Sequence, residues 1–237
     1  MKKSSFKSPT TIKQFYKLSL ILKLYLHLTM FRIINGTAKR FKKMKIVTII
    51  LVVILIAFVF VQLYFMLAQR NIETYPYKVK KKYDGFEIRS YEATLFTSVK
   101  LSTKGYNHSS GQGFSILARY IFGNNERNEK ISMTSPVSIS LEDSMTMMFM
   151  VPKKLNKDML PKPNQSGIEF REEPAKTVAA IRFSGWANDI KIEKYKQQLK
   201  EAVDAEGIKY SNQFYFFGYN APYEVFNRKN EIIVELP

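Results

Sequence analysis

One uninterrupted apolar run constrains this chain more than any other feature. From Ile46 to Ala68 the sequence holds 23 residues without a charge, and only Thr48 and Gln62 among them are clearly polar. As a helix with a rise of about 1.5 Å per residue, the run reaches roughly 34 Å, enough to cross a hydrocarbon core of about 30 Å. We therefore expect residues 46–68 to form a single transmembrane helix.

Two other interpretations of this run are weaker. The core helix of a small soluble domain rarely lacks a charge over such a length. The apolar part of a cleaved signal peptide typically spans only about 7–15 residues, and Met66 is a poor residue three positions before a cut after Ala68. An uncleaved anchor remains the favoured interpretation.

The orientation of the anchor follows from the charges beside it. Five basic residues precede the run, namely Lys39, Arg40, Lys42, Lys43 and Lys45. Arg70 and Glu73 follow it and nearly cancel. The excess of positive charge on cytoplasmic flanks predicts a single-pass membrane protein with a cytoplasmic N-terminus and an extracytoplasmic domain over residues 70–237.

The formal net charge of +17 is concentrated in the N-terminal tail. Residues 1–45 hold twelve Lys and Arg and no acidic residue, so the rest of the chain carries only +5. The tail is interpreted as cytoplasmic and basic, either with an interfacial helix over Ile12–Ile34 or as an untranslated stretch before a start at Met44. Because the basic excess lies outside the main domain, which also lacks nucleic-acid-binding motifs, we expect no nucleic-acid partner.

Composition also limits the chemistry of the main domain. The chain has no cysteine, which excludes disulfides, thiolate metal sites and cysteine nucleophiles. Its two histidines are His27, in the tail, and His108, in a Gly/Ser-rich segment expected to be a loop. No nucleophile elbow, phosphate loop, zinc helix or dinucleotide fingerprint is present. The sequence therefore predicts neither a metal site nor an enzyme.

Beyond the anchor, residues 69–82 are expected to form a polar tether and residues 83–237 one domain. Residue patterns predict two helices, Gln112–Ile121 and Ile190–Ala205. They also predict eight strands, near Phe86–Tyr91, Thr94–Leu101, Ile131–Leu141, Thr146–Pro152, Ile168–Glu173, Lys176–Phe183, Gln213–Tyr219 and Glu231–Leu236. Asn188 or Asp189 is expected to cap the second helix.

The order of these elements contains an internal repeat. Each half runs strand, helix, strand, strand, with a proline-containing turn near Ser135-Pro136 in one half and Ala221-Pro222 in the other. The sequence thus predicts an α+β fold in which duplicated β-α-β-β units form a distorted barrel or curved antiparallel sheet with two packed helices. Such a sheet leaves apolar grooves suited to a small molecule.

Three stretches of the domain resemble the SOUL heme-binding family. They are FEIRSYEATLFTSV (86–99), FSILARYIFGNNERNEKISMTSPVSI (114–139) and FYFFGYNAPYEVFNRKNEIIVEL (214–236). Much of the specificity lies in the proline-containing phrases and in the Asn-Arg-x-Asn-Glu motif of residues 227–231. The resemblance covers about residues 77–237, and order and spacing agree from end to end.

The resemblance implies that heme or another tetrapyrrole binds in an apolar groove beside the first helix of the domain. Some family members place a histidine where this chain has Ser90, so that axial ligand is missing. Members without the histidine rely on apolar and basic contacts around the first helix, which Phe114, Leu117, Ala118 and Arg119 match here.

Methionines are concentrated on the strands after the first helix. They are Met133, Met145, Met147, Met148 and Met150. Thioethers adapt to a ligand's shape and are able to ligate iron, but alternating strand positions are more simply explained as core packing. We include Met133 among the predicted ligand-binding residues. The alternative functions are a sensing or interaction domain for another apolar molecule, a lipid or a protein partner, with heme binding lost, or an enzyme acting on a small amphiphile.

Overall fold

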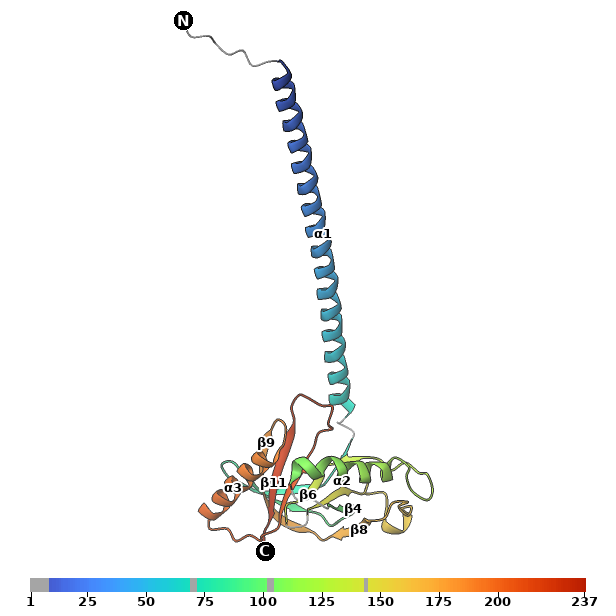
Figure 1. The fold of residues 1–237 in the computed structure, drawn as a ribbon. Coiled ribbons are helices and arrows are strands. Elements are labelled where there is room, and N and C mark those ends of the chain that lie inside the picture. The colour runs from blue at the N-terminus through green and yellow to red at the C-terminus, as the bar shows by residue number, and fades with distance from the viewer. Residues whose placement is uncertain (1–8, 69–71, 102–104, 143–144) are drawn as a thin grey trace. The chain divides into compact units, whose positions relative to one another are not determined.

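The computed structural model describes residues 9–68, 72–101, 105–142 and 145–237 (Figure 1). It forms two compact units, Met1–Val61 and Gln62–Pro237, and each is described by itself. Residues 1–8 of the predicted tail and residues 69–71 of the predicted tether lie outside the described part of the chain.

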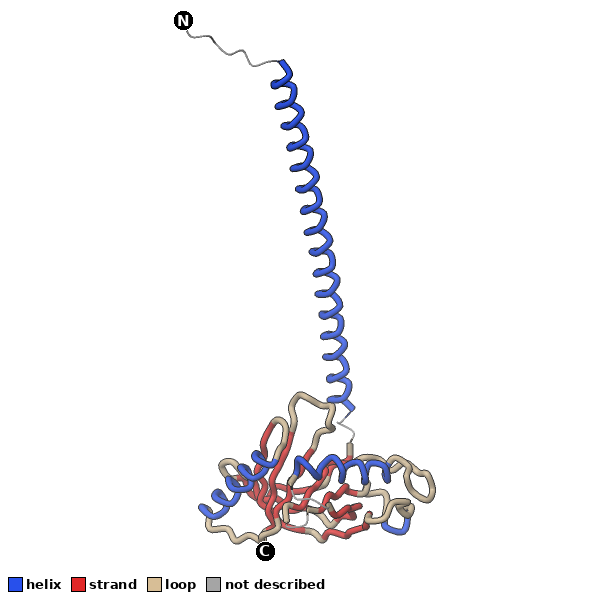
Figure 2. The backbone as a smooth tube through the Cα atoms, viewed as in Figure 1, coloured by secondary structure: helices blue, strands red, loops and turns tan. Residues whose placement is uncertain are grey.

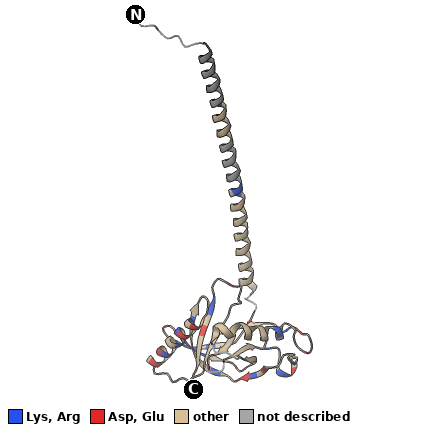
Figure 3. Ribbon diagram, viewed as in Figure 1, with Lys and Arg blue, Asp and Glu red and all other residues tan. Residues whose placement is uncertain are grey.

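Helix α1 (Pro9–Ala68) contains the apolar run. Within it, Lys43–Phe65 is long and apolar enough to cross a membrane, by length and composition. Its side chains are exposed or half-exposed, and no charged residue follows Lys45 up to the end of the helix (Figure 3). The helix predicted over residues 46–68 is therefore present as the C-terminal part of a longer helix.

A curled antiparallel sheet of nine strands forms the framework of the domain (Figure 2). In spatial order the strands are β2 (Tyr77–Lys82), β3 (Glu87–Tyr91), β9 (Lys176–Ser184), β11 (Lys229–Glu235), β10 (Phe214–Gly218), β6 (Val137–Ser140), β7 (Thr146–Met150), β4 (Thr94–Lys100) and β8 (Ile168–Glu173). Two short strands, β1 (Glu73–Thr74) and β5 (Thr134–Ser135), pair in parallel beside it.

The predicted duplication is confirmed by the strand order. One unit is β4, helix α2 (Tyr106–Ile121), β6 and β7, and the other is β9, helix α3 (Asp189–Ala205), β10 and β11. In each unit the first strand lies outermost, the third in the middle and the second innermost. The two innermost strands, β6 and β10, pair antiparallel, which joins the units into one sheet.

Two differences from the prediction concern strands. Residues 77–82, assigned to the tether, form β2, which pairs antiparallel with β3. All six of its residues are exposed, and the alternation of apolar and polar residues extends only over residues 77–80 before two further lysines, too short to mark a strand with a buried face. The single strand expected over residues 131–141 is divided into β5 and β6 at Pro136, which has no N–H to donate to a ladder.

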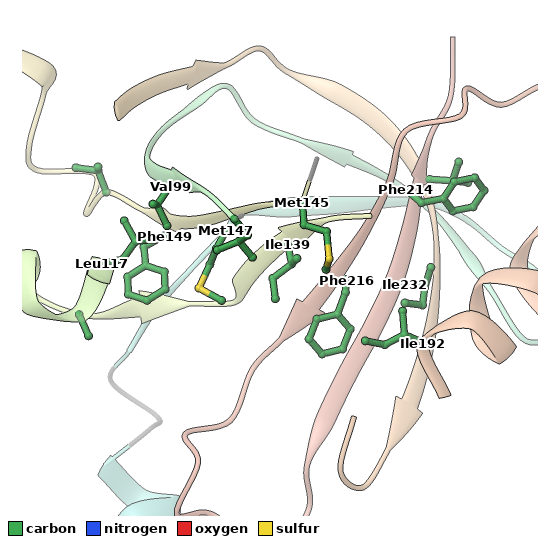
Figure 4. Close-up of a cluster of buried hydrophobic side chains, with 14 of the residues drawn as sticks. Val99, Leu117, Ile139, Met145, Met147, Phe149, Ile192, Phe214, Phe216 and Ile232 are labelled. Atoms are coloured by element: carbon green, nitrogen blue, oxygen red, sulfur yellow. The ribbon is translucent and has the colours of Figure 1, made fainter. Parts of the chain in front are cut away.

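Both faces of the sheet are buried over the central strands. On the face covered by the helices, alternate residues such as Ile139, Met147 and Phe216 pack beneath α2 and α3 (Figure 4). On the opposite face, Met148, Phe217 and their neighbours form a second apolar cluster. Burial on two sides explains why β7 and β10 consist of nearly continuous apolar residues.

Helix α2 begins six residues before its predicted start, because its cap comes from elsewhere in the chain. Gly105 precedes the helix without a side-chain cap. Instead the carboxylate of Asp189 accepts hydrogen bonds from the main-chain N–H of Tyr106 at 2.5 Å and of Asn107 at 3.3 Å. Asn188 caps α3 through the Lys191 N–H at 2.8 Å, as predicted.

Candidate ligand-binding groove

A groove runs beside α2, bounded by that helix, strands β6 and β10, and the loop between β10 and β11. Two adjoining hollows compose it, and both are lined by Phe114, Val137 and Gly218. The hollow toward Trp186 and Arg228 has a volume of about 260 Å³. The two hollows share these lining residues and therefore lie next to each other along the helix.

The bottom of this groove is formed by residues of the main hydrophobic core. Ile139 and Phe216, which line the hollow near Trp186, belong to the buried cluster beneath the helices (Figure 4). Phe114 is half buried on α2, and its ring centroid lies 5.4 Å from that of Phe149 on β7. A ligand seated here therefore contacts a rigid apolar surface.

The end of the groove near Trp186 carries a cation, Arg228. Its Nη1 donates to the main-chain oxygens of Ala221 at 3.0 Å and Glu224 at 2.6 Å. Its Cζ lies 4.0 Å from the centre of the Trp186 ring. Its Nε is buried and has no hydrogen-bond partner among the described residues. Burial lowers the pKa of Arg228 from its ordinary value, against the smaller raising effect of Tyr106 and Glu224.

Another arginine, Arg89, is buried on the opposite face of the sheet and is fully paired. Its Nη1 and Nη2 donate to the two carboxylate oxygens of Glu231 at 2.8 and 3.2 Å, and its Nε donates to Glu87 at 2.9 Å. Tyr219 donates to Glu231 at 2.6 Å, and Lys229 lies 3.1 Å from the same carboxylate. With 5% and 0% exposure, Arg89 and Glu231 form a closed network.

The structure brings some of the predicted site residues together. Phe114 and Met133 line the groove. Ala118 and Arg119 line a shallower hollow on the outer side of α2, next to Phe114 and Phe122. Phe114, Ala118 and Arg119 lie on α2, and Met133 lies beside it in the groove wall, with Arg119 exposed to solvent.

Leu117 and Ser90 lie apart from the groove surface. Leu117 is fully buried and packs in the main core. Ser90 is on β3, opposite Lys78 and Thr177, and lines neither hollow of the groove. Strand β3 is three strand spacings from β10, about 14 Å along the sheet.

The remaining methionines pack in the core, as their alternating positions predicted. Met145 and Met147 belong to the main cluster, and Met148 and Met150 to the cluster on the opposite face. His108 was expected in a loop but is an exposed residue in the first turn of α2. Across the described ranges, no group of three His, Asp or Glu side chains is arranged to hold a metal ion.

Sequence reasoning did not identify Arg228 as a site residue. It lies in the Asn-Arg-x-Asn-Glu motif, which marked the family resemblance without assigning the arginine a role. Trp186, which was not among the predicted site residues either, is 53% exposed and borders the hollow. Neither role has a local sequence signal, because the two residues meet only when β9 and β11 pair.

Comparison with known families gives a match over most of the domain. The profile of a family described as "SOUL heme-binding protein" matches residues 72–235. Heme-binding protein 1 of Sus scrofa is 24% identical over 174 residues, covering 68% of this chain and 92% of the relative. Heme-binding protein 2 of Homo sapiens is 27% identical over 156 residues, covering 62% of this chain and 76% of the relative.

Solved structures share the fold at much lower identity. The C-terminal domain of EcmrR has a TM-score of 0.51 and 11% identity, covering 68% of this chain and 98% of the domain. At that identity the similarity concerns the architecture of the curled sheet and its two helices.

Proposed function

Because this chain belongs to the SOUL heme-binding protein family, we propose that it binds heme or a similar amphiphilic tetrapyrrole in the groove beside α2. It acts as a binding protein rather than an enzyme, and residues 46–68 anchor it in a membrane. The observation that carries the proposal is the combination of an apolar groove with a half-buried cation at one end, Arg228, whose buried Nε has no partner among the described residues.

The groove residues fit the chemistry of a tetrapyrrole. A flat macrocycle needs an apolar surface for its face, which Phe114, Val137 and Phe216 supply. Its propionates need cations, and the unpaired Nε of Arg228 is a donor that lacks an acceptor. Heme, when bound, would supply an iron centre, and the thioethers of Met133 and Met147 in the groove walls are soft donors of a type that ligates heme iron.

The proposed anchor rests on the sequence of α1. Lys43–Phe65 is uncharged apart from Lys43 and Lys45, and five basic residues lie at or just before its start. With the positive-inside rule, this predicts a cytoplasmic N-terminus and an extracytoplasmic groove domain. A groove held near a bilayer would suit a ligand that partitions into lipid.

A hemin titration of the detergent-solubilised full chain tests the binding function. We expect a Soret shift that saturates near one hemin per chain. Phe114→Ala should weaken binding about tenfold or more, since it removes an aromatic wall of both hollows. Ser90→His should leave the affinity unchanged, because Ser90 lies outside the groove. Non-saturating binding that Phe114→Ala does not affect would refute the proposal and favour another apolar ligand.

Protease protection in sealed membrane vesicles tests the topology. In right-side-out vesicles an added protease should reach the domain of residues 72–237 and leave residues 1–45 protected. Protection of the domain in those vesicles would reverse the proposed orientation, and extraction of the whole chain by alkaline carbonate would rule out a spanning anchor.

A further inference from the structure

We propose that Arg228 binds a carboxylate of the ligand, so that the groove selects amphiphiles carrying a carboxylate beside a flat apolar body. This inference rests on the proposed binding function and adds the residue and the ligand group that set specificity. It predicts that a porphyrin with free carboxylates binds more tightly than the same porphyrin with those groups esterified.

The first support is the way the guanidinium is held. An arginine presents its N–H donors in a rigid planar fork that matches a carboxylate. In Arg228 the two hydrogen bonds to Ala221 and Glu224 both leave from Nη1. These bonds fix the orientation of the plane, while the edge containing Nε has a donor without a partner in the described part of the chain.

The second support is that the carboxylate of Glu224, in the same loop, accepts hydrogen bonds from residues other than Arg228. Glu224, buried at 6% exposure, accepts hydrogen bonds from Ala221 N at 3.1 Å and Asn220 Nδ2 at 2.8 Å. Arg228 meets Glu224 through its main-chain oxygen. The polar groups of the loop therefore surround Arg228 but leave its Nε without an acceptor. An incoming carboxylate is able to supply that acceptor.

The third support is the position of Trp186. Its ring covers one face of the guanidinium, and both residues line the hollow that holds Phe114 and Phe216. Because Nε is covered, a carboxylate reaches it only when a neighbouring side chain shifts. The Trp186 ring, at 53% exposure, has room to move outward. It is also the single tryptophan of the chain, so its fluorescence reports on this end of the groove.

The test compares protoporphyrin IX with its dimethyl ester, bound to the full chain in the same detergent and followed by quenching of Trp186. We expect the wild type to bind the free acid about tenfold or more tightly than the diester, the gain typical of a charge-assisted hydrogen bond. Arg228→Gln should bring the ratio of the two dissociation constants close to one. Arg182→Gln removes an exposed arginine from β9 and should retain the wild-type ratio.

The ratio separates the outcomes. If the wild type binds acid and diester equally, or if Arg228→Gln retains the preference, the role of Arg228 is refuted while the binding function stands. If neither porphyrin binds, the proposed function fails and this inference with it. Should Arg228→Gln lose its thermal unfolding transition, Arg228→Lys decides, because a point charge without the fork should keep only part of the preference.

Discussion

Arg89 lies on β3 and Arg228 lies just before β11. The two arginines differ in how completely the protein satisfies their hydrogen-bond donors. Arg89 gives Nε to one carboxylate and both terminal nitrogens to another, and its network lies on the sheet face opposite the helices. Arg228 gives Nη1 to two main-chain oxygens and leaves Nε unpaired at the edge of a groove. Arg89 is buried and Arg228 half-buried, but only Arg89 has all of its nitrogens hydrogen-bonded to carboxylates of the protein.

The difference distinguishes a structural charge from a binding charge. A buried ion pair that is completely hydrogen-bonded holds strands in register and has no capacity left for a ligand. A buried donor without an acceptor carries a desolvation cost of about 1–3 kcal/mol that a ligand is able to relieve. On this contrast, the Arg89 network should contribute to stability and Arg228 to ligand binding. Substitutions at the two arginines should therefore have different effects.

Breaking the closed network should have the largest effect on stability. Arg89→Met leaves Glu231 buried at 0% exposure without its principal partner, and we expect a loss of about 3–5 kcal/mol in the free energy of unfolding. Arg228→Met should cost about 1 kcal/mol or less, since it removes two hydrogen bonds together with an unpaired donor. Urea unfolding of both variants measures the difference, and equal losses would contradict the contrast.

The closed network should also govern the acid sensitivity of the fold. Burial raises the pKa of Glu231, but the hydrogen bonds and charge of Arg89, aided by Tyr219 and Lys229, outweigh it and bring the pKa below its ordinary value of 4.5. A lowered folded-state pKa means that this stabilisation is complete above about pH 4.5 and is lost as pH falls through the folded pKa. Glu231→Gln should flatten the decline of stability below pH 4.5, and Arg228→Gln should leave it unchanged. The free energy of unfolding of both variants, measured over a series of pH values below 7, tests this. An unchanged decline in Glu231→Gln or a flattened one in Arg228→Gln would contradict the assignment.

Much of the fold was predictable because its signals are local. Apolar residues alternate with charged ones at the start of β8, which matches its predicted bounds of Ile168–Glu173, and most other strands end within a few residues of theirs. The exceptions depend on distant partners. Strand β2 is exposed throughout, and the start of α2 is fixed by Asp189, which lies 83 residues from Tyr106 in the sequence.

The candidate site was less predictable for the same reason. Phe114 belongs to a helical stripe and Met133 to a family stretch, so both were found from local sequence. Leu117 belongs to that stripe too, yet it points into the core, and a periodic pattern does not separate the groove edge from the buried side. Arg228 was missed because what distinguishes it is a buried Nε without a hydrogen-bond partner. That feature is visible only in the fold, which places Arg228 between the loop before β11 and the ring of Trp186.

The smallest effect is expected from alanine substitutions of two glycines on different sides of α2. A methyl group at Gly113 would lie 2.6 Å from Leu101 Cδ2, whereas one at Gly111 would have nothing within 4 Å. Replacing a helical glycine by alanine stabilises by about 0.5–1 kcal/mol where space allows, while overpacking a core costs about 1–3 kcal/mol. Gly111→Ala should therefore raise the free energy of unfolding by about 0.5–1 kcal/mol, and Gly113→Ala should lower it by about 1 kcal/mol. Shifts of the same sign in thermal unfolding would mean that the side of α2 facing β4 is not tightly packed, and the distinction between a sealed core and an open groove along this helix would fail.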